Sequence, residues 1–415
     1  MAAPRLTLSR WWIVGLLSAT ATAGYLCRVN LSVAGALLME EFHLSQVEMG
    51  RVFSAFLLGY ALCQLPGGLL ADRIGARRVL VAITWWWVLA TAMQAAIGTS
   101  LLPASAAVTL VALAVARFVM GVGAAPTYPA AAQGVSRWVP PAAQGRATGL
   151  VIASVGIGSA LAPPLISNVM VRWGWRASLL ASAIPAFFFA LVWLAIREPA
   201  PTAAEAPLPV TTRPRLTRAL ATRNLALLTL SYSLQGYVGY IFVFWFYLYL
   251  VQVRHFDLLK GAWLSSLPWV LSIVSIPAGG FVSDWLSRGA LGPVWGRRLV
   301  AMVGLAGSGV LISLGARTGN AYLAAAYLAL ATALVLSVEG PFWATAVAVA
   351  GPHSGAAGGI MNTGCNIGGL ISPALTPVLA SAIGWEMALH LAAALAVAGG
   401  LLWFWITPKA HYLNA

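Results

Sequence analysis

Three ionisable side chains lie inside long apolar stretches of this 415-residue chain, and they are Arg28, Arg117 and Glu339. A charged side chain in the middle of a bilayer costs about 2.5 to more than 10 kcal/mol, depending on how the cost is measured. A chain that keeps two cations and one carboxylate at such positions is expected to use them. Because a guanidinium presents a planar fork of donors that matches a carboxylate, the two arginines indicate that the chain binds an anion.

Arg28 is the stronger candidate for contact with that anion. It lies deep in its apolar stretch, too far from either end for its side chain to reach a membrane surface easily. Tyr25 lies three residues before it and Ser32 four residues after it, so the three residues share one face of a helix. The alternative is a structural arginine that donates hydrogen bonds to carbonyl groups of a broken neighbouring helix.

Arg117 leaves two interpretations open. Pro126 and Pro129 follow it in the sequence and interrupt helical hydrogen bonding, which leaves carbonyl groups in need of donors. Arg117 is therefore expected either to bind such carbonyl groups while it closes a gate, or to contact the substrate directly.

Glu339 is the only acid inside an apolar stretch, and the following Gly340-Pro341 predicts a helix break beside it. Burial favours the neutral form of a carboxyl group, whereas a nearby arginine favours the charged form. A carboxyl group held between these influences can take up and release a proton, so Glu339 is predicted to be a proton carrier. The alternative is a static ion pair with Arg28 or Arg117.

The composition sets the class of protein that must position these side chains. The chain is 60% hydrophobic and only 8% charged, and its mean hydropathy is +0.85. Apolar runs long enough to cross a bilayer recur along its whole length, which predicts an all-α membrane protein with twelve transmembrane helices. The predicted spans are 11–37, 48–70, 78–99, 105–135, 144–170, 174–196, 224–251, 260–285, 297–316, 320–349, 355–383 and 385–407. The first run lacks a small-residue cleavage signal, so it is interpreted as a retained span.

The net charge of +14 reflects topology and does not indicate nucleic-acid binding. Sorting the 24 Lys and Arg residues by loop places about 16 on one face of the membrane and about six on the other. The positive-inside rule then places both termini in the cytoplasm, and a bacterial-type inner membrane is the expected location.

The chain divides into two halves with traces of a duplication. Segments 67–78 and 279–298 both begin with Gly-Gly, carry an Asp five residues after the first Gly, and end in a basic pair. We predict an N-terminal six-helix bundle over 1–196, a cytoplasmic linker over 197–223 and a C-terminal six-helix bundle over 224–415. Parallel repeats of this kind are typical of transporters that work by alternating access.

These motifs resemble those of a known family. Gly68-x-x-x-Asp72-Arg73-x-Gly75-x-Arg77-Arg78 resembles the major facilitator loop signature between the second and third helices, and Arg117-x-x-x-Gly121-x-x-x-Ala125 is similar to its fourth-helix signature. Segments 25–42, 56–78, 116–130, 341–346 and 358–373 narrow the resemblance to the anion:cation symporter branch. That branch includes sugar-acid, hexuronate, sialic-acid, phosphate and vesicular glutamate carriers. The resemblance implies a fold of two pseudo-symmetric six-helix bundles.

The resemblance also implies roles for particular residues. In this branch the arginine at the position of Arg28 binds the substrate carboxylate, and Arg117 falls on the fourth-helix arginine. Other positions that match cavity-lining residues of the branch are Tyr25, Tyr60, Tyr240 and Asn362. Two departures put the coupling mechanism in doubt, because Cys27 and Ala124 stand where proton-coupled members have an Asp and a Glu.

A further set of residues is predicted to act in gating at the cytoplasmic rim, as a charge latch between the halves. The members of this set are Asp72, Arg73, Gly75, Arg77, Arg78 and Asp284. Asn366, which lies four residues after Asn362, is predicted to hold neighbouring helices together. Most tryptophans, Trp85 to Trp87 among them, are interpreted as interfacial belts.

We therefore expect a secondary carrier of a small organic anion, working by proton symport in the lipid bilayer as a monomer. No enzymatic motif, cofactor or metal site is predicted. An anion exchanger or uniporter without proton coupling is the alternative within transport. A transporter-like anion sensor is a remote alternative, because the tails outside the predicted spans are short.

Overall fold

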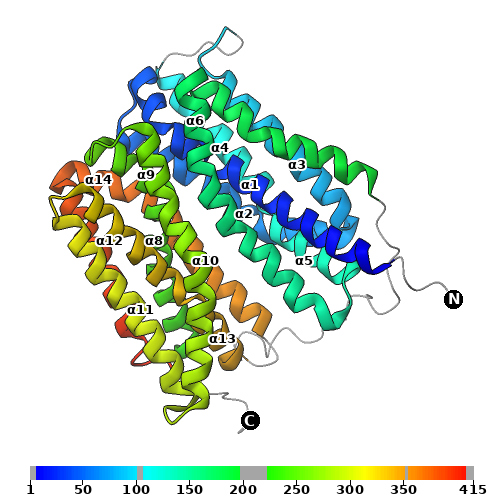
Figure 1. Cartoon of the computed structure of the whole chain (residues 1–415), viewed down its shortest axis with the longest axis vertical. Coiled ribbons are helices and arrows are strands. Elements are labelled where there is room, and N and C mark those ends of the chain that lie inside the picture. Colours follow the sequence, from blue (N-terminus) through cyan, green and yellow to red (C-terminus); the bar gives the residue numbers. More distant parts are fainter. Residues whose placement is uncertain (1–5, 101–105, 197–221, 351–353, 408–415) are drawn as a thin grey trace. The chain divides into compact units, whose positions relative to one another are not determined.

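The computed structural model describes residues 6–100, 106–196, 222–350 and 354–407, and these residues are helical along most of their length (Figure 1). No β-strand occurs among them. Ten of the described helices are long and apolar enough to cross a membrane. The prediction of an all-α membrane protein with many spans is thereby confirmed.

The chain forms two compact units. The first comprises residues up to 206 together with 255–266, and the second comprises 207–254 and 267–415. The predicted linker over 197–223 lies outside the described residues except for its last two positions, so its boundaries and those of the two predicted domains stay predictions.

The helices follow the order of the predicted spans. Those before the linker are α1 (Leu6–Phe42), α2 (Gln46–Ile74), α3 (Ala76–Ala96), α4 (Ala106–Ala124), α5 (Thr127–Trp138) and α6 (Pro141–Ala195). Those after it are α8 (Arg223–Phe244), α9 (Phe246–Leu248), the π-helix η2 (Tyr249–Val253), α10 (Leu258–Arg288), α11 (Gly292–Arg317), α12 (Ala321–Ser337), α13 (Glu339–Ala350) and α14 (Ser354–Leu402). In the first unit α1 packs mainly against α6, and in the second α8 packs mainly against α14.

Helices α6 and α14 each contain one glycine that leaves the helical conformation. Gly174 has φ 81° and Gly384 has φ 83°, a region that glycine adopts without steric cost. These glycines coincide with the predicted boundaries between spans 144–170 and 174–196 and between spans 355–383 and 385–407. Because each pair of spans is continuous apart from that glycine, the count of twelve separate helices stays a prediction.

The two helix breaks predicted from proline are present. The first separates α4 from α5 at Ala125 and Pro126, and the second separates α12 from α13 at Val338, directly before Glu339. The breaks place Arg117 one turn or more before a helix end and Glu339 at a helix start.

Close packing between α2 and α4 depends on two glycines. A Cβ atom on Gly121 would lie 2.0 Å from the carbonyl oxygen of Phe56, and one on Gly59 would lie 2.3 Å from that of Phe118. The two backbones therefore touch directly, as small residues allow in membrane helices. In the second unit, Gly368 approaches the carbonyl of Ser233 on α8 in the same manner.

The prediction that Trp85 to Trp87 form an interfacial belt is wrong for Trp87, which is buried inside its unit, whereas Trp86 is exposed. The indole of Trp86 donates to the carbonyl of Val119 at 2.7 Å, and that of Trp87 donates to the carbonyl of Gly123 at 3.1 Å. Both acceptors lie in the last turns of α4, and the carbonyl of Gly123 is one of the last four of that helix, which lack a donor within the helix. The two indoles thus join α3 to the last turns of α4.

The glycine contact gives a test of the fold. We expect Gly121→Ala to lower the stability of the purified protein by about 1–3 kcal/mol, because the added methyl group must push α2 away from α4. Thermal unfolding in detergent measures the effect. Gly15→Ala is the matched control, since no atom lies within 4 Å of its added Cβ. Equal melting temperatures for the two variants would contradict this packing.

Candidate functional site

The N-terminal unit brings the two buried arginines together. Arg28 on α1 is 7% exposed, and Arg117 on α4 is fully buried. The Nη2 atom of Arg117 donates to the backbone carbonyl of Arg28 at 2.7 Å. Arg117 therefore has a structural bond to α1 at the residue that carries the other guanidinium. This agrees with its predicted structural role but leaves a role in gating or substrate contact a prediction.

Aromatic rings surround the pair. Phe56 on α2 lies against both guanidinium groups, with its centroid 5.1 Å from Cζ of Arg28 and 5.0 Å from Cζ of Arg117. Tyr25 and Tyr60 lie at 5.2 Å from Cζ of Arg28. The negative faces of aromatic rings stabilise cations, which helps this unit hold two like charges close together.

Two positive charges lie close together in this cluster, and Arg117 has buried donors without a partner. The guanidinium groups of Arg117 and Arg28 repel each other electrostatically. The Nε and Nη1 atoms of Arg117 are buried and have no hydrogen-bond partner among the described residues. Buried donors of this kind gain most from a negatively charged acceptor. The local chemistry thus favours an anion.

Two further features of this cluster concern residues that the sequence argument treated differently. Tyr128 on α5, which was not predicted, hydrogen-bonds to Tyr25 and interacts electrostatically with Arg28. Cys27, which stands where proton-coupled relatives of the branch are expected to have an Asp, is fully buried, and its thiol donates to the carbonyl of Ser182 at 3.4 Å. The position next to Arg28 is therefore occupied by an uncharged group that already has a partner.

Glu339 lies in the C-terminal unit at the first residue of α13. Its Oε2 atom accepts a hydrogen bond from the hydroxyl of Tyr232 at 2.7 Å, and its Oε1 atom accepts one from Nε2 of Gln235 at 2.9 Å. Both donors lie on α8, and the ring of Tyr232 packs on Phe342 at 4.7 Å. Within the described part of this unit, neutral donors and no ion pair hold the carboxylate.

The other predicted substrate contacts of the C-terminal unit lie on α8 and α14. Tyr240 stacks on Phe244 with their ring centroids 6.0 Å apart. Its ring also packs directly on Gly369, because a Cβ atom added to that glycine would lie 2.5 Å from the ring. Asn362 uses its backbone carbonyl to accept a hydrogen bond from Nδ2 of Asn366 at 3.0 Å. This bond lies within one helix, so the predicted joining of helices by Asn366 is not tested by it.

The rim residues lie at the ends of helices. Gly75 has φ 90° and joins α2 to α3. Arg77 donates to the carbonyl groups of Trp193 and Leu194 at the end of α6, at 3.1 and 2.6 Å. In the second unit Arg298 donates to the carbonyl of Ile406 at 2.8 Å. Arg77 therefore holds its own unit together.

The remaining rim residues are surface groups. The exposed members of the predicted latch are Asp72, Arg73, Arg78 and Asp284. Asp284 interacts electrostatically with Arg297. A latch between the halves stays a prediction.

The structure thus groups the predicted residues within each unit. Arg28, Tyr25, Tyr60 and Arg117 form one cluster, whereas Glu339 has a separate set of partners. Four residues of these clusters were not predicted from the sequence, and they are Phe56, Tyr128, Tyr232 and Gln235. Of these four, Gln235 could have been recognised from the sequence, because an amide inside an apolar span also needs a hydrogen-bond partner. No group of three metal-ligating side chains occurs among the described residues.

Comparison with known proteins gives one family match and three similar proteins. The family described as the Major Facilitator Superfamily matches residues 12–294. A probable sulfoacetate transporter of Cupriavidus necator is 28% identical, over 96% of this chain and 94% of its own length. A hexuronate transporter of Bacillus subtilis is 28% identical, over 92% of this chain and 89% of its own. A D-galactonate transporter of Escherichia coli is 25% identical, over 94% of each chain.

The fold also matches a solved structure. A bacterial homologue of the human lysosomal transporter Spinster superimposes with a TM-score of 0.80 at 18% identity, over 98% of both chains. At this identity the match shows the fold alone, and it confirms the predicted major facilitator fold. Because the similar proteins are transporters, the prediction that the chain is not an enzyme is also confirmed.

The bond between the two arginines can be tested directly. Arg117→Lys keeps the positive charge but loses the fork that reaches the carbonyl of Arg28, so we expect stability to fall by about 1–3 kcal/mol. Thermal unfolding of the purified protein measures this loss. The control is Arg146→Lys, because Arg146 is exposed and lies over the ring of Trp11 at 5.6 Å. A melting temperature that falls no further for Arg117→Lys than for the control would show that the bond contributes nothing.

Proposed function

Because the chain belongs to the Major Facilitator Superfamily, we propose that it is a secondary active transporter that moves a small organic anion by alternating access. One observation carries this proposal: Arg28 and Arg117 share the ring of Phe56 in the interior of the N-terminal unit. Two guanidinium groups at this depth are costly unless a negative charge compensates them.

The names of similar proteins support the class of substrate. Those proteins are named for sulfoacetate, hexuronate and D-galactonate, each of which is a small anion with a carboxylate. A carboxylate accepts two parallel hydrogen bonds from a guanidinium. We assign this contact to Arg28, and we assign to Tyr25 and Tyr60 the remaining contacts within the N-terminal unit. Arg117 holds the backbone of Arg28 in place and adds positive charge.

Contacts to the rest of the solute are assigned to the C-terminal unit. Tyr240 can donate its hydroxyl hydrogen to an oxygen of the solute or place its ring against a sugar. The side-chain amide of Asn362 can both donate and accept, which suits a hydroxyl group. These roles rest on the match of both positions to the anion:cation symporter branch.

Proton coupling is assigned to Glu339. Its carboxylate is held by the hydroxyl of Tyr232 and the amide of Gln235, so no permanent countercharge within its unit fixes it in the ionised form. A buried carboxyl group without such a countercharge can accept a proton and become neutral. The direction follows: a proton bound to Glu339 travels with the anion, which makes the transporter a symporter. We place the protein in the inner membrane as a monomer. The distribution of Lys and Arg predicts that both termini lie in the cytoplasm.

An exchanger or uniporter is the second candidate, and Cys27 and Ala124 favour it. Proton-coupled members of the branch carry acids at both positions, whereas Cys27 is neutral and bonded to Ser182. In that case Glu339 would be a structural partner of α8.

The anion site is tested by binding. Purified protein is titrated with sulfoacetate, a hexuronate and galactonate, and thermal stabilisation reports the dissociation constant. We expect Arg28→Ala to weaken the binding of any ligand found by about ten- to a hundredfold, because a charge-assisted bond is lost. Arg146→Ala is the control, and its affinity should equal that of the wild type. Unchanged affinity in Arg28→Ala would remove Arg28 from the site.

The proton role of Glu339 is tested in proteoliposomes. A pH gradient across the membrane should drive uptake of the anion against its gradient in the wild type. We expect Glu339→Gln to lose this accumulation while it keeps exchange of labelled for unlabelled anion, since the anion site is intact. Asp257→Asn removes an exposed acid and serves as the control. Accumulation that persists in Glu339→Gln would rule out the carrier role, and wild-type protein without any accumulation would favour the exchanger or uniporter.

A further inference from the structure

Each unit has a corner at which an arginine binds carbonyl groups at the end of a helix. This helix is α3 in the first unit and α11 in the second. In the N-terminal unit the corner follows Gly174. There Arg176 forms an ion pair with Glu41 at 2.7 Å and donates through Nη2 to the carbonyl of Ile97 at 3.2 Å, just after α3. The indole of Trp175 donates to the same Glu41 at 2.6 Å. At this corner an ion pair therefore joins the end of α1 to the second part of α6.

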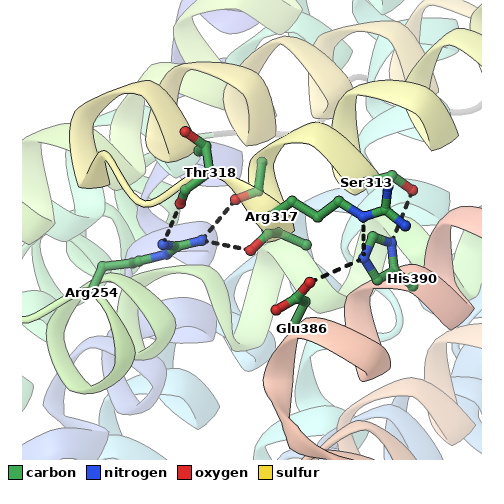
Figure 2. Close-up of polar contacts among 8 residues, drawn as sticks. Arg254, Ser313, Arg317, Thr318, Glu386 and His390 are labelled. Carbon is green, nitrogen blue, oxygen red and sulfur yellow. Dashed lines mark hydrogen bonds and ion pairs between the residues drawn. The ribbon is translucent and has the colours of Figure 1, made fainter.

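The C-terminal unit repeats this corner with the charges exchanged. Gly384-Trp385-Glu386 stands where the first half has Gly174-Trp175-Arg176, and both glycines have a positive φ. The arginine comes instead from Arg254, directly after η2. It donates to the carbonyl groups of Gly315, Ala316 and Thr318, at 2.7, 3.1 and 2.8 Å, and so holds the end of α11 (Figure 2).

The repeated corner differs in one respect, because its acid is paired with a histidine. In the described structure the ion-pair partner of Glu386 is Nε2 of His390 at 3.6 Å, one helical turn further along α14. As an ion pair this contact needs a positively charged imidazole, and as a hydrogen bond it needs a ring that carries a hydrogen on Nε2. The carboxylate of Glu386 is 59% exposed and the ring of His390 is 17% exposed, so water can deliver a proton.

His390 has a second partner that requires the opposite state. Nε of Arg317 lies 3.3 Å from Nε2 of His390, and Nδ1 of His390 lies 3.2 Å from the hydroxyl of Ser313 (Figure 2). Arginine can only donate, so this bond needs a lone pair on Nε2. The ring is then neutral, with its hydrogen on Nδ1 facing Ser313. Glu386 and Arg317 thus compete for one nitrogen atom, and the proton decides which of them binds.

From this geometry we propose that His390 is a proton-operated switch of the C-terminal unit. When neutral, it joins α14 to α11 by accepting a hydrogen bond from Arg317. When a proton binds at Nε2, the new N–H group turns to the carboxylate of Glu386, and the positive ring repels Arg317. The inference concerns regulation by pH and does not depend on the identity or movement of the solute.

The surroundings of His390 supply few other charges that could mask this response. On its own helix the near group is Glu386, and on α11 it is Arg317. At the end of η2 the groups are Tyr249, whose ring packs on Trp385 at 5.7 Å, and Arg254, which is held by carbonyl groups of α11. Helices α8 and α13 also pack on α14. The titratable groups on these helices are Arg223, Tyr232, Tyr237 and Tyr240 of α8 and Glu339 of α13, and Tyr232 donates to Glu339. The switch therefore acts on Arg317, while Arg254 keeps the end of α11 in place.

Double-mutant cycles on the full-length purified protein test the switch. The variants are His390→Gln, Glu386→Gln, Arg317→Gln and the two pairs that include His390, and the readout is the apparent Tm in detergent without substrate. Free histidine changes its charge between about pH 5 and 8. We expect His390 and Glu386 to be coupled by about 2 °C or more near pH 5.5 and uncoupled near pH 8. Coupling between His390 and Arg317 should show the reverse.

The first half provides the matched control. The cycle of Glu41→Gln and Arg176→Gln should give the same coupling at both pH values, because neither group changes its charge between them. Couplings of His390 that do not change in opposite directions would overturn the proposal. Should a variant fail to fold, ¹⁵N NMR of the remaining variants and the wild type decides the matter. The neutral ring near pH 8 must carry its hydrogen on Nδ1, and a hydrogen on Nε2 would overturn the switch.

Discussion

Inside a bilayer no water is available to satisfy a polar group, and this constraint determines how each unit of the protein is held together. A buried polar group is therefore stabilised by a partner on another helix or on its own backbone. Arg117 on α4 donates to the carbonyl of Arg28 on α1, and two side chains of α8 donate to Glu339 on α13. The groups that could bind solute or proton are therefore also the groups that join helices. A change of their charge must affect the packing of those helices as well as the binding of a ligand.

The same constraint explains what could be predicted from the sequence. Charged residues in apolar stretches are visible in one dimension, so Arg28, Arg117 and Glu339 could be identified, and helix breaks follow from local proline and glycine. Partners that come from distant helices leave no local pattern. Nothing in the sequence distinguishes Phe56 from other aromatic residues of membrane spans, although its ring lies against both arginines. Trp87 has the residue type of an interfacial belt, yet its indole donates to the carbonyl of Gly123.

The two halves have interactions at corresponding positions, but the side chains that form these interactions differ. Arg77 and Arg298 both bind carbonyl groups near the end of the last helix of their half. At the glycine corners, the arginine has moved from the second part of α6 to the end of η2, and the acid has moved in the opposite sense. Backbone geometry survives this exchange because Gly174 and Gly384 set the same turn. The two corners therefore share a backbone turn and differ in side-chain chemistry, and one of them contains His390.

The direct contact between α2 and α4 has a mechanical consequence. At Gly59 and Gly121 the two backbones meet with no side chain between them, and Gly368 brings α14 equally near α8. Sliding one helix along its neighbour by a single residue would drive a side chain into a carbonyl group. Such pairs are therefore expected to move together when the transporter changes conformation. Bending is then expected where the helices are interrupted, and one such place is Val338, directly before Glu339.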